Sequence, residues 1–237
     1  MDNAIYANLT RQSGLMREMQ LIANNIANAA TTGYRQEGLV FSEFIRRIDG
    51  GESLSMATAT VRDTSMLQGS MTQTGGNLDL AIDGDGFFLV ETAQGQRLTR
   101  AGHFMVSATG DLVTPAGHMV LDAGGAPVFV PPDAVDLSVS GDGTISAGGQ
   151  PLGQIGVVMP IDPMTLTRET GTLFRSEQGT VPSDTGRVLQ GFLESSNVDP
   201  VGQIARMIQV QRAYEMGQAL LEREDERIRT AIKTFIR

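Results

Sequence analysis

Two histidines and one run of acidic residues are the side chains of this sequence that could hold a metal ion. His103 and His118 lie near turns, and no cysteine or further histidine is present to complete a zinc site. Residues 83–86, Asp-Gly-Asp-Gly, resemble the start of a calcium loop but lack its third ligand and its final glutamate. We therefore expect no metal and no other cofactor, structural roles for both histidines, and a hairpin turn at residues 83–86.

The hydroxyl groups of the sequence do not form a recognisable catalytic site. Ser195 and Ser196 have no G-x-S-x-G turn around them, and neither a phosphate-binding loop nor a dinucleotide fingerprint occurs. Paired carboxylates could serve a glycosidase, but the acidic residues fall mainly in glycine-rich turns, where aspartate is used for its backbone hydrogen bonds. The sequence therefore predicts a protein that is not an enzyme.

The composition describes a folded, acidic protein. The chain has 237 residues, of which 41% are hydrophobic, and this is enough to bury a sizeable core. Its formal charge of -9 argues against nucleic acid as a partner, because phosphates attract a basic surface. The acidity is concentrated in residues 77–180, which carry four basic and twelve acidic residues. No apolar run is long enough to span a bilayer and the start does not resemble a signal peptide, so we expect no membrane insertion.

The elements that position these residues begin and end with a helix. Apolar residues recur every seven positions from residue 4 to residue 30, and Gly33 can then end the helix in the left-handed conformation. Asp199 and Pro200 form an N-cap and a first helical position for a second helix. The apolar heptad column of this second helix is unbroken and consists of Met207, Tyr214, Leu221, Ile228 and Phe235, with Val210 beside it. Each helix therefore presents an apolar face that needs a partner.

The middle of the chain has the pattern of antiparallel strands. Short apolar runs between residues 78 and 159 alternate with turn sequences such as Ser-Gly-Asp-Gly. We predict an α+β fold in which the terminal helices pair as an antiparallel coiled coil and a central all-β domain is sandwich-like or barrel-like. The predicted segments are an N-terminal helix at 1–35, an extended ascending connection at 36–76, the β domain at 77–160, a descending connection at 161–198 and a C-terminal helix at 199–237.

The end of the first helix has an unusual composition. Asn24, Asn25 and Asn28 surround Ile26, and the sixteen positions between Glu18 and Arg35 hold no charged residue. An exposed helix face normally carries lysine and glutamate. Neutral amides lose their water at a protein interface with a smaller desolvation penalty than charged groups do. We predict that Ile26 continues the apolar face and that Asn24 and Asn28 point away from it toward neighbouring subunits, with Asn25 at the border. The alternative is a frayed helix end before the glycine.

Three stretches resemble the bacterial flagellar rod and hook protein family. They are "NNIANAATTGYR" at residues 24–35, the β-domain stretch "LDLAIDGDGFFLV" at residues 78–90 and "LESSNVDPVGQIARMIQVQRAYEM" at residues 193–216. Within this family, the opening "MDNAIYANLTRQ" and the short length are most similar to the proximal-rod members, with the distal-rod members next. The resemblance covers nearly the whole chain.

The resemblance implies a structural component of the rod, which transmits motor torque across the periplasm. It implies a homo-oligomer that also contacts other rod proteins, and export through the flagellar type III export apparatus without a cleaved signal peptide. The terminal helices would line the inner tube while the β domain faces outward. The residues then expected at subunit interfaces are Asn24, Asn25, Ile26, Asn28, Thr32, Gly33, Tyr34, Met207, Val210, Gln211, Tyr214, Leu221 and Ile228.

Two alternatives remain open from the residues themselves. The heptad column at residues 207–235 fits an intramolecular two-helix core as well as it fits a tube of many subunits. A monomeric β module that binds cell-wall glycan, with the helices as a stalk, is a function of a different class. An enzyme has the least support.

Overall fold

The computed structural model describes residues 2–46 and 54–235. The chain folds as two compact units. Unit 1 consists of Met1–Ala27, Glu37–Ser65 and Asp199–Arg237, and unit 2 consists of Asn28–Gln36 and Met66–Val198. Within the described residues, neither helix combines the length and apolarity that a membrane span requires. Residue 1, residues 47–53 of the predicted ascending connection and residues 236–237 of the predicted C-terminal helix lie outside the described residues.

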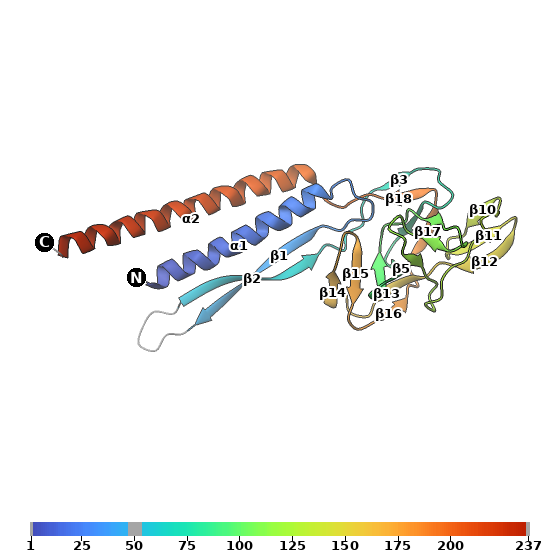
Figure 1. Cartoon of the computed structure of the whole chain (residues 1–237), viewed down its shortest axis with the longest axis horizontal. Helices are drawn as coiled ribbons and strands as arrows, with labels where there is room; N and C mark the ends of the chain where they lie inside the picture. The colour runs from blue at the N-terminus through green and yellow to red at the C-terminus, as the bar shows by residue number, and fades with distance from the viewer. Residues whose placement is uncertain (1, 47–53, 236–237) are drawn as a thin grey trace. The chain divides into compact units, whose positions relative to one another are not determined.

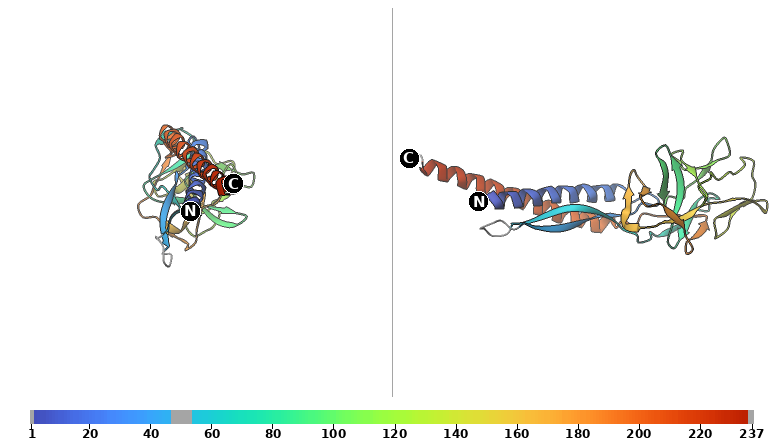
Figure 2. Two further views of the ribbon diagram at one scale, coloured as in Figure 1. Left: turned by 90° about the vertical axis from the view of Figure 1, so that its left-hand side faces the viewer. Right: turned by 90° about the horizontal axis from the view of Figure 1, so that it is seen from below.

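Unit 1 contains two long helices and two long strands. The helices are α1 (Asp2–Ala27) and α2 (Pro200–Phe235), and the strands are β1 (Glu37–Arg46) and β2 (Leu54–Thr64). The strands pair antiparallel, with Glu37 opposite Thr64, and the register shifts between Val40 and Phe41. Figures 1 and 2 show α1 and α2 side by side, with the strands running along them.

Local chemistry explains where the helices begin and end. Asp199 caps α2, because its side-chain Oδ1 accepts a hydrogen bond from the backbone N–H of Val201 at 3.1 Å, as the sequence predicts. Helix α1 ends at Ala27, three residues before the apolar period ends at residue 30 and eight residues before the predicted segment boundary at residue 35. The carbonyl of Asn28 instead accepts a hydrogen bond from the N–H of Thr31 at 3.0 Å, which closes a tight turn.

Unit 2 is built from short antiparallel strands in four sheets. The largest sheet holds β5 (Phe87–Thr92), β6 (Gly95–Thr99), β7 (Met105–Val106), β8 (Leu112–Val113), β9 (Met119–Val120), β13 (Val157–Pro160), β14 (Leu166–Arg168), β15 (Leu173–Ser176) and β16 (Thr180–Pro182). A second sheet holds β10 (Leu137–Val139), β11 (Thr144–Ala147) and β12 (Gln150–Gln154). Two strand pairs complete the unit, β4 (Leu80–Asp83) with β17 (Arg187–Gln190) and β3 (Met71–Gln73) with β18 (Phe192–Glu194). A short 3-10 helix, η1, spans Pro163–Thr165.

The core of unit 2 lies on both sides of β5. Phe88 and Val90 belong to one buried cluster, whereas Phe87 and Leu89 belong to a second one. Successive side chains of a strand point to opposite faces, so a strand with four consecutive buried residues is covered on both faces. The predicted α+β class is confirmed, with a helix at each end and a mostly β region between them.

The structure differs from the sequence prediction in three segments. Residues 36–76, expected as an extended connection, contain the paired strands β1 and β2 as well as β3. Residues 161–198, expected as a descending connection, contribute β14, β15 and β16 to the largest sheet. The turn at residues 83–86 is not a hairpin, because β4 pairs with β17 while β5 pairs with other strands. The short strands of residues 161–198, separated by Pro, Gly and Ser, give too little periodicity for recognition in sequence.

Candidate assembly surface

The two helices of unit 1 contact each other in antiparallel order. Asn8 donates its side-chain N–H to the carbonyl of Gly217 at 2.9 Å, and Arg206 binds the carboxylate of Glu18 at 2.7 Å. Gly217 permits this approach, since a Cβ at this position would lie 3.2 Å from Asn8 Oδ1. Residues early in α1 therefore lie beside the middle of α2, and residues late in α1 lie beside the beginning of α2.

The predicted heptad column of α2 forms the side of the helix that the chain covers most. Val210 is buried, and the other described side chains of the column are half-buried, namely Met207, Tyr214, Leu221 and Ile228. We call these five residues the inner face of α2. Gln211 lies off this face, is exposed, and donates to Glu215 Oε1 at 3.1 Å.

A second apolar row on α2 was not predicted from the sequence. Five large side chains, exposed by between 46% and 77%, are Val201, Ile204, Ile208, Met216 and Leu220. Their spacings of three, four, eight and four residues place them on one side of an α-helix, opposite the inner face. We call them the outer stripe of α2. The spacing of this row is visible in the sequence, but the heptad column of the same helix is more regular.

Helix α1 also exposes apolar residues at heptad spacing. Leu9 is 56% exposed and Met16 is 43% exposed, and Ala23, seven residues further on, is exposed as well. Asn24 is exposed on the same part of the helix. The exposed end of α1 is thus apolar or neutral, as the run without charges predicts.

Asn25 has a structural role that the sequence did not reveal. Its side chain is 1% exposed. The side-chain amide donates to the carbonyl of Glu37 at 2.8 Å and accepts from the N–H of Glu37 at 3.0 Å. One asparagine thus pairs with both backbone groups at the start of β1. Asn28 and Ile26 are half-buried, and Asn28 Oδ1 accepts from the Thr31 hydroxyl at 3.2 Å.

Thr32, Gly33 and Tyr34 follow α1 and belong to unit 2. Thr32 is half-buried. Gly33 has a φ of +68°, and a Cβ there would lie 2.3 Å from the backbone nitrogen of Ala101, so only glycine fits. Tyr34 is 1% exposed, and the guanidinium of Arg168 lies 4.3 Å from its ring centroid. The side chain of Tyr34 therefore contributes to the interior of unit 2.

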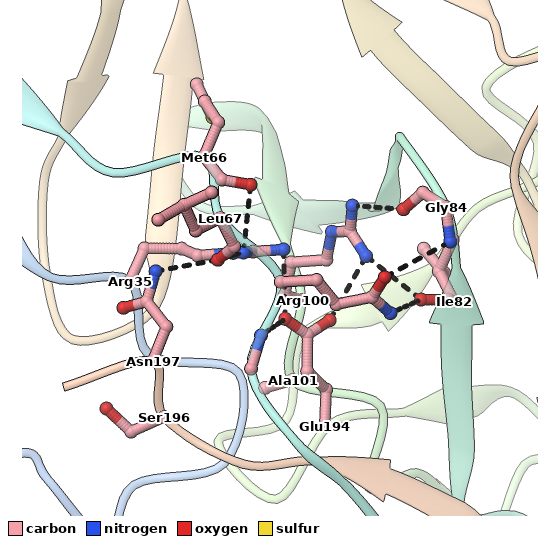
Figure 3. A network of polar contacts seen from close by, with 12 residues as sticks. Arg35, Met66, Leu67, Ile82, Gly84, Arg100, Ala101, Glu194, Ser196 and Asn197 are labelled. Atoms are coloured by element: carbon pink, nitrogen blue, oxygen red, sulfur yellow. Dashed lines mark hydrogen bonds and ion pairs between the residues drawn. The ribbon is translucent and has the colours of Figure 1, made fainter. Parts of the chain in front are cut away.

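A buried ionic network lies next to Tyr34 (Figure 3). The carboxylate of Glu194 accepts from Arg35 at 2.9 Å, from Arg100 at 3.1 Å and from the N–H of Gly69 at 3.0 Å. Burial lowers the pKa of Arg35 to about 10, although Glu194 raises it, and the second cation, Arg100, lowers it further. Burial also lowers the pKa of Arg100, against the effect of Glu194. We call Arg35, Arg100, Glu194 and Asn197 the polar clamp.

His103 lies in a small polar cluster with Asp79 and Thr74. His103 Nδ1 lies 2.5 Å from Asp79 Oδ1, and the hydroxyl of Thr74 donates to the same carboxylate at 2.6 Å. Burial raises the pKa of Asp79, but these two hydrogen bonds outweigh it and leave the pKa below its ordinary value. Among the described residues, no three histidine, aspartate or glutamate side chains gather as a metal site would require.

Three protein-family models match this chain. A model described as flagella basal body rod protein matches residues 5–35, one described as flagellar hook protein FlgE/F/G D1 domain matches residues 81–147, and one described as flagellar basal body rod FlgEFG protein C-terminal matches residues 189–234. The matched ranges cover α1, the centre of unit 2 and nearly all of α2.

Similar proteins share almost the full length of the chain. The flagellar basal-body rod protein FlgF of Caulobacter vibrioides is 40% identical over 98% of each chain. FlgF of Mesorhizobium japonicum is 36% identical over 99% of this chain and 98% of its own. The flagellar basal-body rod protein FlgG of Bacillus subtilis is 32% identical over 94% of this chain and 95% of its own. The resemblance seen in the sequence is thereby confirmed.

Proposed function

The chain belongs to the FlgE/F/G family of flagellar rod and hook proteins, and we propose that it occupies the proximal rod and polymerises there through its terminal helices. It is a structural component of the flagellar basal-body rod, in a family of structural proteins rather than enzymes. Two FlgF relatives, at 40% and 36% identity, support the proximal position over the distal one. Family membership does not favour the alternative of a glycan-binding module.

The outer stripe of α2 is the observation that carries this proposal. Contiguous exposed apolar side chains on a soluble protein mark a surface that another molecule covers. Burying one large apolar side chain stabilises a contact by about 1.5–3 kcal/mol, and the stripe offers five side chains that are each at least 46% exposed. The exposed row on α1 consists of Leu9, Met16 and Ala23. In the proposed assembly, this row of one copy packs against the outer stripe of a neighbouring copy. Helices of neighbouring rod subunits are therefore the proposed occupants.

The unequal lengths of the helices support the same proposal. Asn8 lies level with Gly217, so the rise of 1.5 Å per residue places the start of α1 near residue 223 of α2. Figure 1 shows α2 continuing beyond that point. Ile228 of the inner face lies in this extension, beyond the described residues of α1. A helix of another subunit would complete the face, and we interpret the whole arrangement as antiparallel coiled-coil packing.

The proposed interface uses the predicted residues in two ways. Asn25, Gly33, Tyr34 and Val210 are buried inside the chain and hold the subunit itself together. Subunit contacts are assigned to the exposed or half-buried remainder, namely Asn24, Ile26, Asn28, Thr32, Met207, Gln211, Tyr214, Leu221 and Ile228. Copies of this chain and neighbouring rod proteins are the proposed partners. We also propose that the chain is exported through the type III apparatus without a cleaved signal. It would then lie in the periplasmic part of the rod and transmit torque.

Substitution in the outer stripe tests the proposal. In a strain that lacks the native gene, the double variant Ile204→Glu/Ile208→Glu should be produced and folded but absent from isolated basal bodies, and the cells should not swim. Gln218→Glu, an exposed substitution on the flank of the same helix, is the matched control and should assemble normally. Circular dichroism of the purified variants checks that both helices are retained. Normal incorporation of the Ile204/Ile208 variant would refute assembly through this stripe.

A further inference from the structure

The chain passes between its two units at four points, after Ala27, Gln36, Ser65 and Val198. Three of these points adjoin residues of unit 2 that the polar clamp binds. Arg35 precedes the second point, Met66 and Leu67 follow the third, and Asn197 precedes the fourth. One polar cluster inside unit 2 therefore holds three of the four places where the chain enters or leaves this unit, and we call these three places the chain ends of unit 2.

The clamp ties these chain ends to one another. Arg35 donates to the backbone carbonyls of Met66, at 3.1 Å, and of Leu67. Asn197 donates to the carbonyl of Leu67 at 2.7 Å and accepts from the N–H of Gln36 at 2.6 Å. Side-chain hydrogen bonds to backbone atoms thus connect three segments that are distant in sequence, around residues 35, 67 and 197. Figure 3 shows Arg35, Leu67 and Asn197 of these segments.

The clamp is also anchored to the core of unit 2. Arg100 binds Glu194 and donates to the carbonyls of Ile82, at 3.1 Å, and Gly84, at 2.7 Å. Ile82 belongs to the large buried cluster, and Gly84 follows β4 directly. The carboxylate of Glu194 therefore connects the three chain ends, through Arg100, to the best-packed part of the unit.

Burial of this network needs a reason other than stability. Arg35 and Glu194 are each 1% exposed and Arg100 is 3% exposed, so two cations and one carboxylate have lost their water. Well-packed apolar side chains of similar volume usually stabilise a fold as well as a buried ion pair does. Apolar side chains cannot, however, make directional bonds to the backbone of several segments at once, whereas the planar guanidinium of arginine can.

We infer that the polar clamp is a mechanical junction, which makes the three chain ends move as one body with the core of unit 2. A force on any one of them passes through Arg35, Glu194 and Arg100 to β4. Without the clamp, the same force would separate β3 from β18 one hydrogen bond at a time. The inference rests on the proposed function, because a subunit that transmits torque must pass force between its parts without unravelling.

Pulling on single molecules of the full chain tests the junction directly. The sequence has no cysteine, so Asp63→Cys and Ala93→Cys provide unique attachment sites, of which the first lies just before the third crossing point. In the Glu194→Gln variant, we expect an early lengthening of up to about 25 Å before the core opens, because residues 66–73 come free and can span at most about 3.3 Å per residue. The chain with Glu194 should lack this step. Glu169→Gln is the control, because it removes a partly exposed ion pair with Arg97 in the same unit.

Hydrogen exchange on the freely dissolved protein gives an independent measurement. In Glu194→Gln, the amides of Gly33, Gly69 and Asn197 should exchange at least tenfold faster, while those of Leu89 and Leu98 in the core change less than twofold. Asn197→Ala, which removes no charge, should accelerate exchange near residues 36 and 66–70 even if Glu194→Gln fails to fold. Equal acceleration throughout unit 2, or no local acceleration in Asn197→Ala, would overturn the inference. Because both measurements use unassembled protein, a failure of the assembly proposal would not alter their outcome.

Discussion

Replacement of Asn25 by alanine should destabilise unit 1 although alanine is the better helix former. Asn25 makes two buried hydrogen bonds to the backbone of Glu37, at 2.8 and 3.0 Å. Each buried backbone group that loses its partner costs about 1–3 kcal/mol. The higher helix propensity of alanine returns about 0.7 kcal/mol. We therefore expect Asn25→Ala to lower the free energy of unfolding of unit 1 by about 3 kcal/mol.

The two units can be followed separately in this experiment. Both α-helices of the described chain belong to unit 1, so the circular dichroism signal at 222 nm during urea unfolding reports mainly on that unit. Asn24→Ala is the matched control, since it makes the same chemical change one residue earlier at an exposed position, and it should shift stability by no more than about 0.5 kcal/mol. If both variants unfold at the same urea concentration, the amide of Asn25 does not join α1 to β1.

Three further predictions concern other parts of the molecule. Gly33→Ala should destabilise unit 2 by more than about 2 kcal/mol in thermal unfolding, because its φ of +68° is strained for alanine and the Cβ would collide with the backbone of Ala101; an unchanged melting temperature would contradict this. Asn24→Lys/Asn28→Glu should fold as a monomer but be absent from isolated basal bodies, and normal incorporation would argue against subunit contacts there. The pKa of Asp79 is lowered, so its contribution to stability is complete above about pH 3.9, the pKa in the unfolded chain, and disappears as pH falls through the lower pKa of the folded chain. The Asp79→Asn variant should therefore have a lower melting temperature than the native chain at neutral pH. Its melting temperature should also fall less between pH 5 and pH 2.

The sequence predicted features that depend on regular spacing. The heptad column from Met207 to Ile228 identified the inner face of α2, and Asp199 identified its cap, because both depend on residues close together in the chain. Alternation and glycine turns identified the central strands. Residues 36–65 have no comparable regularity, so the sequence does not predict the long strand pair of unit 1.

The sequence could not predict features that depend on distant residues. Arg35, Arg100 and Glu194 are separated by more than sixty positions each, and an isolated arginine or glutamate is normally a surface residue. Their burial follows only when the chain ends meet in unit 2. The asparagines show the same limitation, because the missing charges indicated a dry face but could not distinguish exposed Asn24 from Asn25, which binds Glu37.

The contact between Asn8 and Gly217 determines how far the two helices can slide along each other. A heptad repeat looks the same after every shift of seven residues, so apolar columns alone would allow several alignments of similar energy. A shift by one heptad would bring Asn8 beside Val210 or Glu224 instead of Gly217. The side chain of Val210 or Glu224 would then occupy the space that Asn8 uses beside Gly217. One amide and one missing side chain thus select a single alignment, and this alignment fixes the length of α2 that extends beyond α1. The part of α2 that extends beyond α1, which includes Ile228, is therefore the same in every copy of the chain.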